Sequence, residues 1–546
     1  MKTYYHILSV VLFVLPCSGL SGQTTSQNFV RTRTMTTSTS SYLDHIEYLD
    51  GLGRLSETVE TKQGGSGQDL VSLIDYDNAG REEKLWLPVP VSGNNGAYVS
   101  PSTLRSNAST AHAGDSYPYR QLIYEASPLE RVRQDYGPGS SWRSASRSLE
   151  SVLLVNSSSL SCGKYTVSND LQTISLVRSG TYATGELSVR KTTDEDGHIS
   201  YEFKDKSGRT VLTRQMDGST SFDTYYVYDC YDNLRVVLPP LASDALSPNG
   251  TYTESTDAIK KYAYLYKYDK HFRPIAKKLP GAEWIYIIYD KAGRVIFTQD
   301  GVQRSKNQWT FTIPDAFDRV VLTGTCTNSL SYGSEPLKNT LVNAVRASGG
   351  SYKGYNLSGT SLSSATLLSV TYYDDYSFTS ENLFPSGMTF ESRSGYASSN
   401  LSTPKGLPTG SITGRTDSNS QYTYTVYYYD ARSRLIQTRR TNHVGGTDHE
   451  YAFDGLAEKR YHQHTAFGST KTEEYVYTYD AARRLTKTTH SWNGGTAKTL
   501  SEKSYDALGR ISTDKKGGLS SLEATYGYDV RSRLVTQTGN LFSQTL

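Results

Sequence analysis

Aromatic or apolar residues alternate with polar ones over much of this chain, and short polar turns interrupt the alternation. Between residues 474 and 488 (EYVYTYDAARRLTKT), tyrosine occupies three alternate positions ending at Tyr479, Asp480 ends the run, and a second alternating run opens at Arg484. A period of two residues places the tyrosines on one face of a strand. Asp favours a turn because its carboxylate can accept backbone N–H groups two residues further on. The stretch therefore predicts a β-hairpin.

The motif of an aromatic residue, Asp, three variable residues and Arg recurs along the chain. Looser copies place Asp50 with Arg54, Asp205 with Arg209 and Asp315 with Arg319, whereas Asp229 and Asp454 lack the Arg. Within the clearest runs, successive aspartates lie 21 to 26 residues apart, which is typical of a repeat protein with two strands in each unit. Seven copies keep all three residues: Tyr76, Asp77 and Arg81; Tyr268, Asp269 and Arg273; Tyr289, Asp290 and Arg294; Tyr429, Asp430 and Arg434; Tyr479, Asp480 and Arg484; Tyr505, Asp506 and Arg510; and Tyr528, Asp529 and Arg533.

The repeated residues favour a structural role. Asp and Arg lie four positions apart across a tight turn, so they can pair with each other or bond to a neighbouring repeat. A Gly just before the Arg, in the copies that have it, supplies a positive φ that closes the turn. An isolated hairpin cannot bury its face, so we expect neighbouring units to stack their tyrosine rings along one sheet.

The pattern divides the chain into six segments. Residues 1–22 combine Lys2, a short apolar run and small residues, which predicts a secretory signal peptide. We therefore expect export, to the cell surface or medium. Pro16 precedes Cys17 where a lipid-attachment motif needs a small residue, which disfavours a lipid anchor. The other segments are a Ser/Thr-rich tether (23–41), an irregular N-terminal module (42–164), a repeat region (165–326), a divergent or inserted Ser/Gly/Tyr-rich region (327–421) and a second repeat region (422–546).

Composition supports a mainly β fold and excludes some functions. The chain has 44 Tyr but 14 Phe and 4 Met, and Tyr and Thr favour half-buried sheet surfaces. Lys and Arg (57) are interspersed with Asp and Glu (54), so no basic surface indicates nucleic-acid binding. No apolar run beyond the signal is long enough for a membrane helix. Cys162, Cys230 and Cys326 are far apart, and their spacing is not that of a metal site.

The repeats resemble the YD repeats of the Rhs family. YLDGLGRL, LVSLIDYDNAGRE and YEASPLERVRQDYGPGSSW resemble the module of unknown function that precedes the repeats in secreted Rhs proteins, and KLPGAEWIYIIYDKAGRVIFTQDG resembles the repeats. The resemblance implies a long sheet that spirals into a hollow shell around a C-terminal polypeptide, often a toxin. The family pattern continues into an Asp-Pro self-cleavage motif and a variable effector. This sequence has 17 Pro but no Asp-Pro dipeptide, so we expect a truncated portion of a shell.

Catalytic and metal chemistry find little support in the sequence. The repeated aspartates lack the Gly-Gly-x-Gly-x-Asp spacing of calcium-binding solenoids, and each full copy has an Arg to compete for the carboxylate. His462 and His464 share a strand face and Asp448, His449 and Glu450 lie upstream, but no third ligand has a fixed spacing that indicates zinc. No nucleophile elbow, P-loop or dinucleotide fingerprint is present. We therefore predict no active site, metal or cofactor.

The sequence leaves two functional interpretations open. The first is an exported, non-enzymatic scaffold that forms the N-terminal part of an Rhs-type shell, whose partner is an enclosed effector or the remainder of the shell. The second is a surface adhesin whose tyrosine-rich faces, with the few Trp residues, bind a glycan or a protein. Strict alternation of the tyrosines favours rings packed in the sheet over rings exposed for binding.

Overall fold

The computed structural model describes residues 24, 26–37, 40–415, 418–441, 445–451, 455–466 and 468–546. The predicted signal segment, residues 1–22, and its Cys17 lie outside this part of the chain. So does Asp454, one of the incomplete motif copies. Within the described residues, no helix is long and apolar enough to cross a membrane.

The chain is mainly β, and the predicted fold of successive hairpins in one long sheet is confirmed. The main sheet has 33 strands among the described residues, and two small sheets are separate from it. The strands are β1(Asn28–Met35), β2(Tyr42–Leu49), β3(Leu55–Glu60), β4(Asp69–Tyr76), β5(Glu82–Trp86), β6(Val89–Val91), β7(Tyr119–Tyr124), β8(Val132–Tyr136), β9(Leu149–Val155), β10(Gly163–Val167), β11(Ser175–Thr181), β12(Ser188–Thr193), β13(Ile199–Lys204), β14(Thr210–Asp217), β15(Thr220–Tyr228), β16(Leu234–Leu238), β17(Asn249–Thr253), β18(Tyr264–Tyr268), β19(Pro274–Lys278), β20(Ile285–Tyr289), β21(Val295–Gln299), β22(Gln308–Pro314), β23(Val320–Thr327), β24(Asn343–Arg346), β25(Tyr355–Ser358), β26(Thr366–Tyr373), β27(Pro408–Arg415), β28(Ser418–Tyr429), β29(Leu435–Arg440), β30(Gly445–Tyr451), β31(Ala457–Ala466), β32(Ser469–Tyr479), β33(Leu485–Trp492), β34(Lys498–Tyr505), β35(Ile511–Lys516), β36(Glu523–Tyr528), β37(Leu534–Gly539) and β38(Gln544–Thr545). The helices are α1(Pro101–Ala111), α2(Ser140–Ser144), α3(Pro240–Asp244), α4(Asp257–Tyr262) and α5(Gly301–Ser305), with 3-10 turns η1(Tyr332–Ser334), η2(Ser377–Thr379) and η3(Ser520–Leu522).

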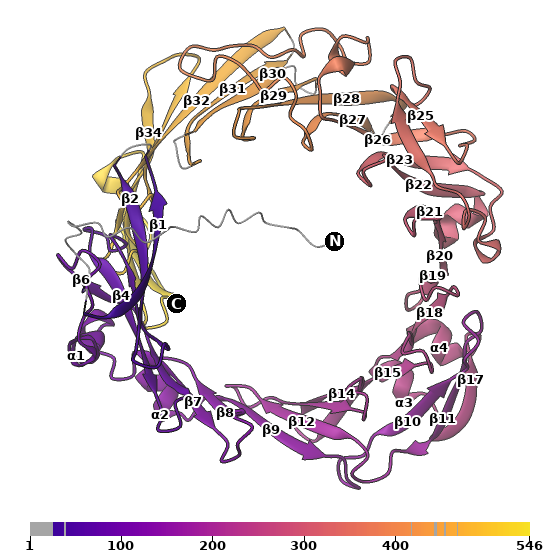
Figure 1. The fold of residues 1–546 in the computed structure, drawn as a ribbon, viewed down its shortest axis with the longest axis horizontal. Helices are drawn as coiled ribbons and strands as arrows, with labels where there is room; N and C mark the ends of the chain where they lie inside the picture. Colours follow the sequence, from indigo (N-terminus) through magenta and orange to yellow (C-terminus); the bar gives the residue numbers. More distant parts are fainter. Residues whose placement is uncertain are drawn as a thin grey trace.

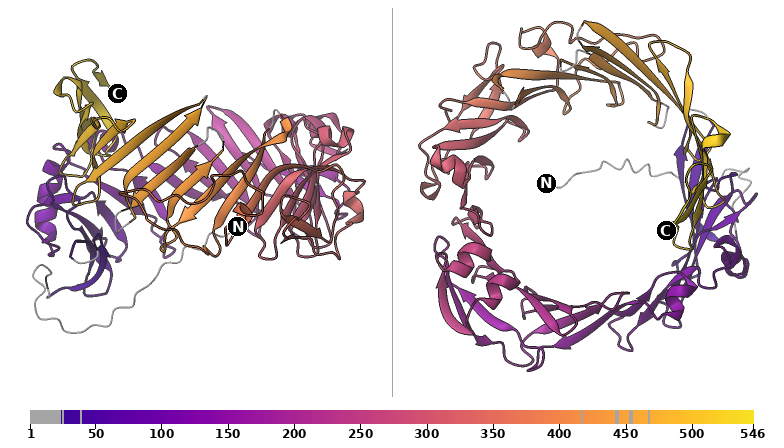
Figure 2. Two further views of the ribbon diagram at one scale, coloured as in Figure 1. Left: turned by 90° about the horizontal axis from the view of Figure 1, so that it is seen from above. Right: turned by 180° about the vertical axis from the view of Figure 1, so that it is seen from behind.

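The main sheet curls into a ring. Seen down the shortest axis, the strands follow one another around a central opening until β32 and β34 reach the first strands, β1 and β2 (Figure 1). Seen from above, the C-terminal strands lie on one side of the N-terminal strands along the ring axis (Figure 2). The chain therefore makes about one revolution of a spiral, in which its last hairpins come to lie beside its first ones.

The two edges of this curled sheet differ. Strands adjacent in the chain pair antiparallel around the ring, so successive turns alternate between the two edges. The aspartates of the repeat motif occupy the turns of one edge, which we call the aspartate edge; examples are 50–54, 290–294 and 480–484. The connections 61–68, 87–118 and 137–148 lie on the other edge, which we call the far edge.

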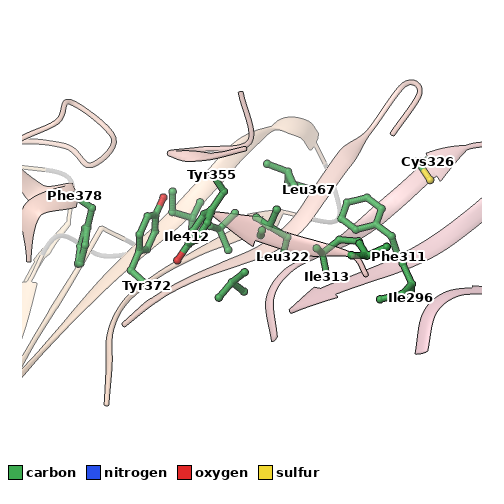
Figure 3. Close-up of a cluster of buried hydrophobic side chains, with 14 of the residues drawn as sticks. Ile296, Phe311, Ile313, Leu322, Cys326, Tyr355, Leu367, Tyr372, Phe378 and Ile412 are labelled. Carbon is green, nitrogen blue, oxygen red and sulfur yellow. The ribbon is translucent and has the colours of Figure 1, made fainter. Parts of the chain in front are cut away.

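Extra elements cover parts of the outer face of the ring. The small sheet β10–β11–β17, the pair β24–β25 and helix α1 lie outside the main sheet (Figure 1). Buried side chains gather beneath them: Val189, Phe203 and Leu212 under β10 and β11, and Phe311, Leu322 and Tyr372 near β25 (Figure 3). Burial of this apolar surface stabilises the wall. The core is therefore divided into several clusters along the ring.

One segment prediction is wrong. Residues 23–41 do not form a plain tether, because β1 pairs with β2 over its whole length, and Arg31 and Arg33 bind Asp44 at 2.8 Å. Those ion pairs and the backbone ladder compensate for the few apolar residues in the stretch.

The region 327–421, expected to be divergent or inserted, carries long insertions and also continues the sheet. Strands β26 and β27 pair with β23 and with β28 in the same order as the other hairpins. The turn between β26 and β27 is an expanded copy of the motif: Asp374 N–H donates to Leu407 O at 3.2 Å, and Gly406 N–H donates to Asp374 Oδ1 at 2.7 Å. The long segment inserted between these residues hides the motif in the sequence.

Candidate functional site: the repeat turns and the seam

The turn at Asp480 shows how each repeat is closed. Asp480 N–H donates to Arg484 O at 3.0 Å, and Arg483 N–H donates to Asp480 O at 3.0 Å, which closes a tight loop; the strand register shifts by one residue between Thr478 and Tyr479. The carboxylate accepts the Arg484 N–H at 2.9 Å and the Arg484 guanidinium at 2.7–2.8 Å. One side chain thus satisfies the turn backbone and the arginine of the next strand.

The other predicted turns repeat this geometry. The Asp carboxylate to Arg Nε distance is 2.6 to 3.0 Å at Asp50, Asp77, Asp205, Asp269, Asp290, Asp315, Asp430, Asp480, Asp506 and Asp529. The residue before the Arg always needs positive φ: it is Gly80 in one copy (φ 84°) but Ser433 (φ 63°) and Ser532 (φ 58°) in others. Residues other than Gly are strained at positive φ, so turns with Ser at this position are locally less stable than turns with Gly.

Each arginine and tyrosine also connects its repeat to a neighbour. The Tyr505 hydroxyl donates to Leu485 O at 2.8 Å, and the Arg484 guanidinium lies 4.4 Å from the Tyr505 ring centroid. The next repeat has the same contacts, from Tyr528 to Ile511 O at 2.9 Å and from Arg510 to the Tyr528 ring at 4.6 Å. Hydrogen bonding and cation–π attraction therefore link successive hairpins. These motif tyrosines belong to the wall and do not form an open aromatic surface.

Some turns of this kind escaped the sequence search. Asp194 pairs with His198 at 2.9 Å on the far edge. In the Asp229 copy, which the sequence shows to lack the Arg, Asp229 accepts the Asn233 side-chain amide at 3.1 Å. Glu125 and Arg131 form a turn that is two residues longer and carries Glu instead of Asp. The sequence DEDGH at residues 194–198 carries the pattern of the turn, with Gly197 at positive φ before His198. A search that requires Asp with Arg four residues later finds neither the Asp194 copy nor the Glu125 copy.

The ring is closed where the aspartate edge of the last repeats meets the far edge of the N-terminal module; we call this contact the seam. Arg484 donates to Gln63 O at 2.6 Å and to Gly64 O at 3.2 Å, although these residues are about 420 positions apart. Gly65 N–H donates to Asp506 O at 2.8 Å. A Cβ at Gly65 would collide with the carbonyl oxygens of Tyr505 and Asp506, so the close approach requires Gly.

A second part of the seam is built around Arg531. Its guanidinium lies 3.7 Å from the Trp142 ring centroid, and its Nε donates to Pro138 O at 2.7 Å. A cavity of about 320 Å³ lies beside this contact, lined by Pro88 and His112 of the module and by residues of the last two repeat turns. Burial lowers the pKa of His112, and the nearby Arg510 charge lowers it further. The seam is therefore a mixed contact of cation–π, backbone and apolar interactions.

Glu57 is an ionisable group in the core behind the seam. It lies on β3, its side chain is fully buried among the apolar residues beneath α1, and it accepts the Val99 N–H at 3.0 Å. Burial raises the pKa of Glu57 to about 8, against the smaller opposing effect of the Val99 hydrogen bond. Glu57 is therefore largely protonated at neutral pH, and its ionisation places an unpaired charge in the module core.

The residues considered for metal or nucleophile chemistry are dispersed. His462 lies 3.6 Å from Glu473, and the His462 and His464 rings are 6.3 Å apart on β31. In the described part of the chain, no group of three or more His, Cys, Asp or Glu side chains is arranged to hold a metal ion. Cys162 and Cys326 are buried and Cys230 is exposed, and burial raises the pKa of the Cys326 thiol to about 11.

Comparisons with known proteins give limited similarity. A family model for a domain of unknown function (DUF6443) matches residues 23–153, less than half of the chain, and this match includes β1. No curated protein matches the sequence. Among solved structures, the chain is similar to TcdB2-TccC3, with 13% identity and a TM-score of 0.45 over 94% of this chain and 25% of that one. The structure titled TcdB2-TccC3-Cdc42 has 13% identity and a TM-score of 0.44 over 94% and 24% of the two chains. The chain thus spans about a quarter of the length of these structures.

Proposed function

We propose that this protein is an exported, non-enzymatic scaffold: a wall segment of an Rhs-type shell that encloses a polypeptide. The observation that carries the proposal is the seam. Arg484 and Arg531 join the last repeats to the N-terminal module, so one revolution of the sheet surrounds a central opening. The motif residues are engaged within the wall, and this supports a structural role for them over a catalytic one.

Protection of a fused polypeptide tests the enclosure. An unstructured reporter with a protease site, fused after Leu546, is expected to be cleaved about tenfold more slowly in the wild-type chain than in the Arg484→Glu/Arg531→Glu variant. The double charge reversal removes the contacts to Gln63, Gly64 and Trp142, so the wall opens at the seam. The matched control is Lys306→Glu/Lys338→Glu, which reverses two exposed charges outside the seam. Equal cleavage in the wild type and the seam variant contradicts the proposal.

Export is a separate part of the proposal, supported by the pattern of residues 1–22. We expect the full chain to leave the cytoplasm of an expressing bacterium with a new N-terminus near residue 23, and a chain without residues 1–22 to stay inside. Cell fractionation and N-terminal sequencing measure this. A mature protein that keeps Lys2, or that carries a lipid on Cys17, contradicts this part of the proposal.

A further inference from the structure

At the seam, an apolar residue at the tip of an aspartate turn meets the far edge. Leu508 N–H donates to the Asp506 carboxylate at 3.0 Å, which places Leu508 at the tip of its turn. The Leu508 side chain is half-buried and lines the seam cavity together with Leu87 and Pro88 of the far edge. We call the second residue after a motif aspartate the tip position.

Three other aspartate turns carry a large apolar residue at the tip position, and all three of these residues are exposed. Leu52, Tyr231 and Phe317 each donate a backbone N–H to the motif aspartate at 2.8 to 2.9 Å, the geometry found at the seam. They are 79%, 53% and 77% exposed, and the Phe272 ring of the adjacent turn lies 5.2 Å from that of Tyr231. Single exposed apolar residues are common, but these recur at one position of one motif along one edge.

The far edge is also apolar and exposed outside the seam. Strands β16, β19 and β21 begin at aspartate turns, so the connections that follow them lie on the far edge. These connections carry Leu241, Leu279 and Val302, which are 67%, 42% and 66% exposed. The last repeats lie beside the N-terminal strands and do not extend over this part of the ring (Figures 1 and 2).

Both halves of the seam contact are therefore present a second time, on opposite rims of one part of the ring. They cannot meet within one ring, because the aspartate edge and the far edge face opposite ways along the ring axis (Figure 2). We infer that the aspartate edge of one copy of this chain docks on the far edge of a second copy, where the exposed tip residues take the place that Leu508 has at the seam.

This contact is head-to-tail, since two different surfaces meet. Each added copy again presents a free aspartate edge and a free far edge, so association continues into a stack of rings and does not stop at a dimer. Burial of the apolar tip residues stabilises each contact. The inference rests on the geometry of the seam and does not depend on what the ring encloses.

Sedimentation velocity of the full chain over a range of concentrations tests the inference. We expect the wild type to form species larger than a dimer as the concentration rises. A wild-type chain that is still monomeric at about 100 μM overturns the inference.

Variants at the two edges locate the contact. Leu52→Asp/Phe317→Asp changes the aspartate edge and Leu241→Asp/Val302→Asp changes the far edge. Each double variant is expected to weaken association at least about tenfold, with melting temperatures unchanged because all four side chains are exposed. Unchanged association in either double variant overturns the inference.

The matched control places two carboxylates at exposed apolar residues away from the turn tips. Leu153→Asp/Val345→Asp changes residues of β9 and β24 that are 51% and 54% exposed, and it should associate as the wild type does. A loss in this control equal to that of the edge variants shows that added charge alone prevents association, which overturns the inference.

A mixture of the two edge variants shows which surfaces meet. The far-edge variant keeps an intact aspartate edge and the aspartate-edge variant keeps an intact far edge, so an equal mixture should form a dimer and nothing larger. A mixture that stays monomeric overturns the inference. So does a far-edge variant that dimerises alone while the aspartate-edge variant does not, because the tips then contact each other.

Discussion

Two hairpins of the ring share one turn motif but differ in their surroundings. At β20–β21, Asp290 is fully buried and Arg294 reaches Asp318 at 2.7 Å and Val342 O at 2.6 Å. At β36–β37, Asp529 makes the same bonds to Arg533 within the turn, but Arg533 is 58% exposed. The local sequence therefore determines the turn, and the neighbouring elements determine how much the turn contributes to stability.

Replacement of the motif aspartate is expected to give the largest difference in stability loss between the two hairpins. Asp290→Ala leaves the Arg294 guanidinium poorly compensated in a buried site and should destabilise its hairpin by about 3 kcal/mol, whereas Asp529→Ala should cost below about 1 kcal/mol. Urea unfolding followed by hydrogen exchange in β20–β21 and β36–β37 measures both values. Equal losses at the two sites contradict the comparison.

The stability of the N-terminal module, which contains Glu57, should change with pH in the opposite direction from the stability of the Asp290 turn. Glu57 has a pKa of about 8 in the folded chain, so the folded state keeps a proton that the unfolded state releases near pH 4.5. Stability of the module therefore falls as pH rises from about 4.5 to 8, and between pH 6 and 9 the loss should be about 3 kcal/mol.

Two comparisons sharpen this pH experiment: Asp290 has the opposite pH dependence, and the Glu57→Gln variant removes the ionisable group. Burial opposes the ionisation of Asp290, but the bonds from Arg294 and from Val342 N–H lower its pKa overall. The stabilisation that ionised Asp290 provides is fully present above the pKa of the unfolded state. It is lost as pH falls through the lower pKa of the folded state. Melting curves from pH 2 to 9 should show the high-pH loss in the wild type but not in Glu57→Gln, and a low-pH loss from Asp290 in both. A high-pH loss of the same size in Glu57→Gln refutes the assignment.

A single added methyl group on the module side should weaken the seam. Gly65→Ala pushes against the Tyr505 and Asp506 carbonyls, so we expect a loss of about 1 to 2 kcal/mol and a larger radius of gyration in solution scattering. Gly51→Ala is the control, because a Cβ there meets nothing within 4 Å. A Gly65→Ala chain with unchanged scattering and melting would show that the seam does not hold the ring closed.

Strain relief in the turns gives the smallest expected effect. Ser433 and Ser532 occupy positive φ, so Ser433→Gly and Ser532→Gly should each stabilise by about 0.5 to 1 kcal/mol. Ser532 also lines the seam cavity, whereas Ser433 does not. Differential scanning calorimetry would measure both: equal gains show that the strain is local, and a gain only at Ser433 shows that the Ser532 side chain supports the seam.

The sequence predicts the turns well because their chemistry is local. Asp480 and Arg484 lie four residues apart, and their pairing requires only a hairpin. Residues 28–35 were misread as part of a tether because backbone pairing and the Arg31 and Arg33 ion pairs, rather than apolar periodicity, hold that strand in place. The Asp374 turn was missed because its two halves are separated by an insertion.

The seam could not be predicted from the sequence. Arg531 reads as a variable residue inside a turn, and its contacts with Pro138 and Trp142 depend on the curvature accumulated over nearly 400 residues. The seam follows from how the ring closes.

The expanded turn at Asp374 suggests how such walls diversify. The ends of the inserted segment, Asp374 and Leu407, are held together by the same backbone bond that closes a four-residue loop elsewhere. A graft at an aspartate turn therefore leaves the paired strands on either side in register. Each such turn offers evolution, or a protein engineer, a place to add a new surface domain while the architecture of the wall is preserved.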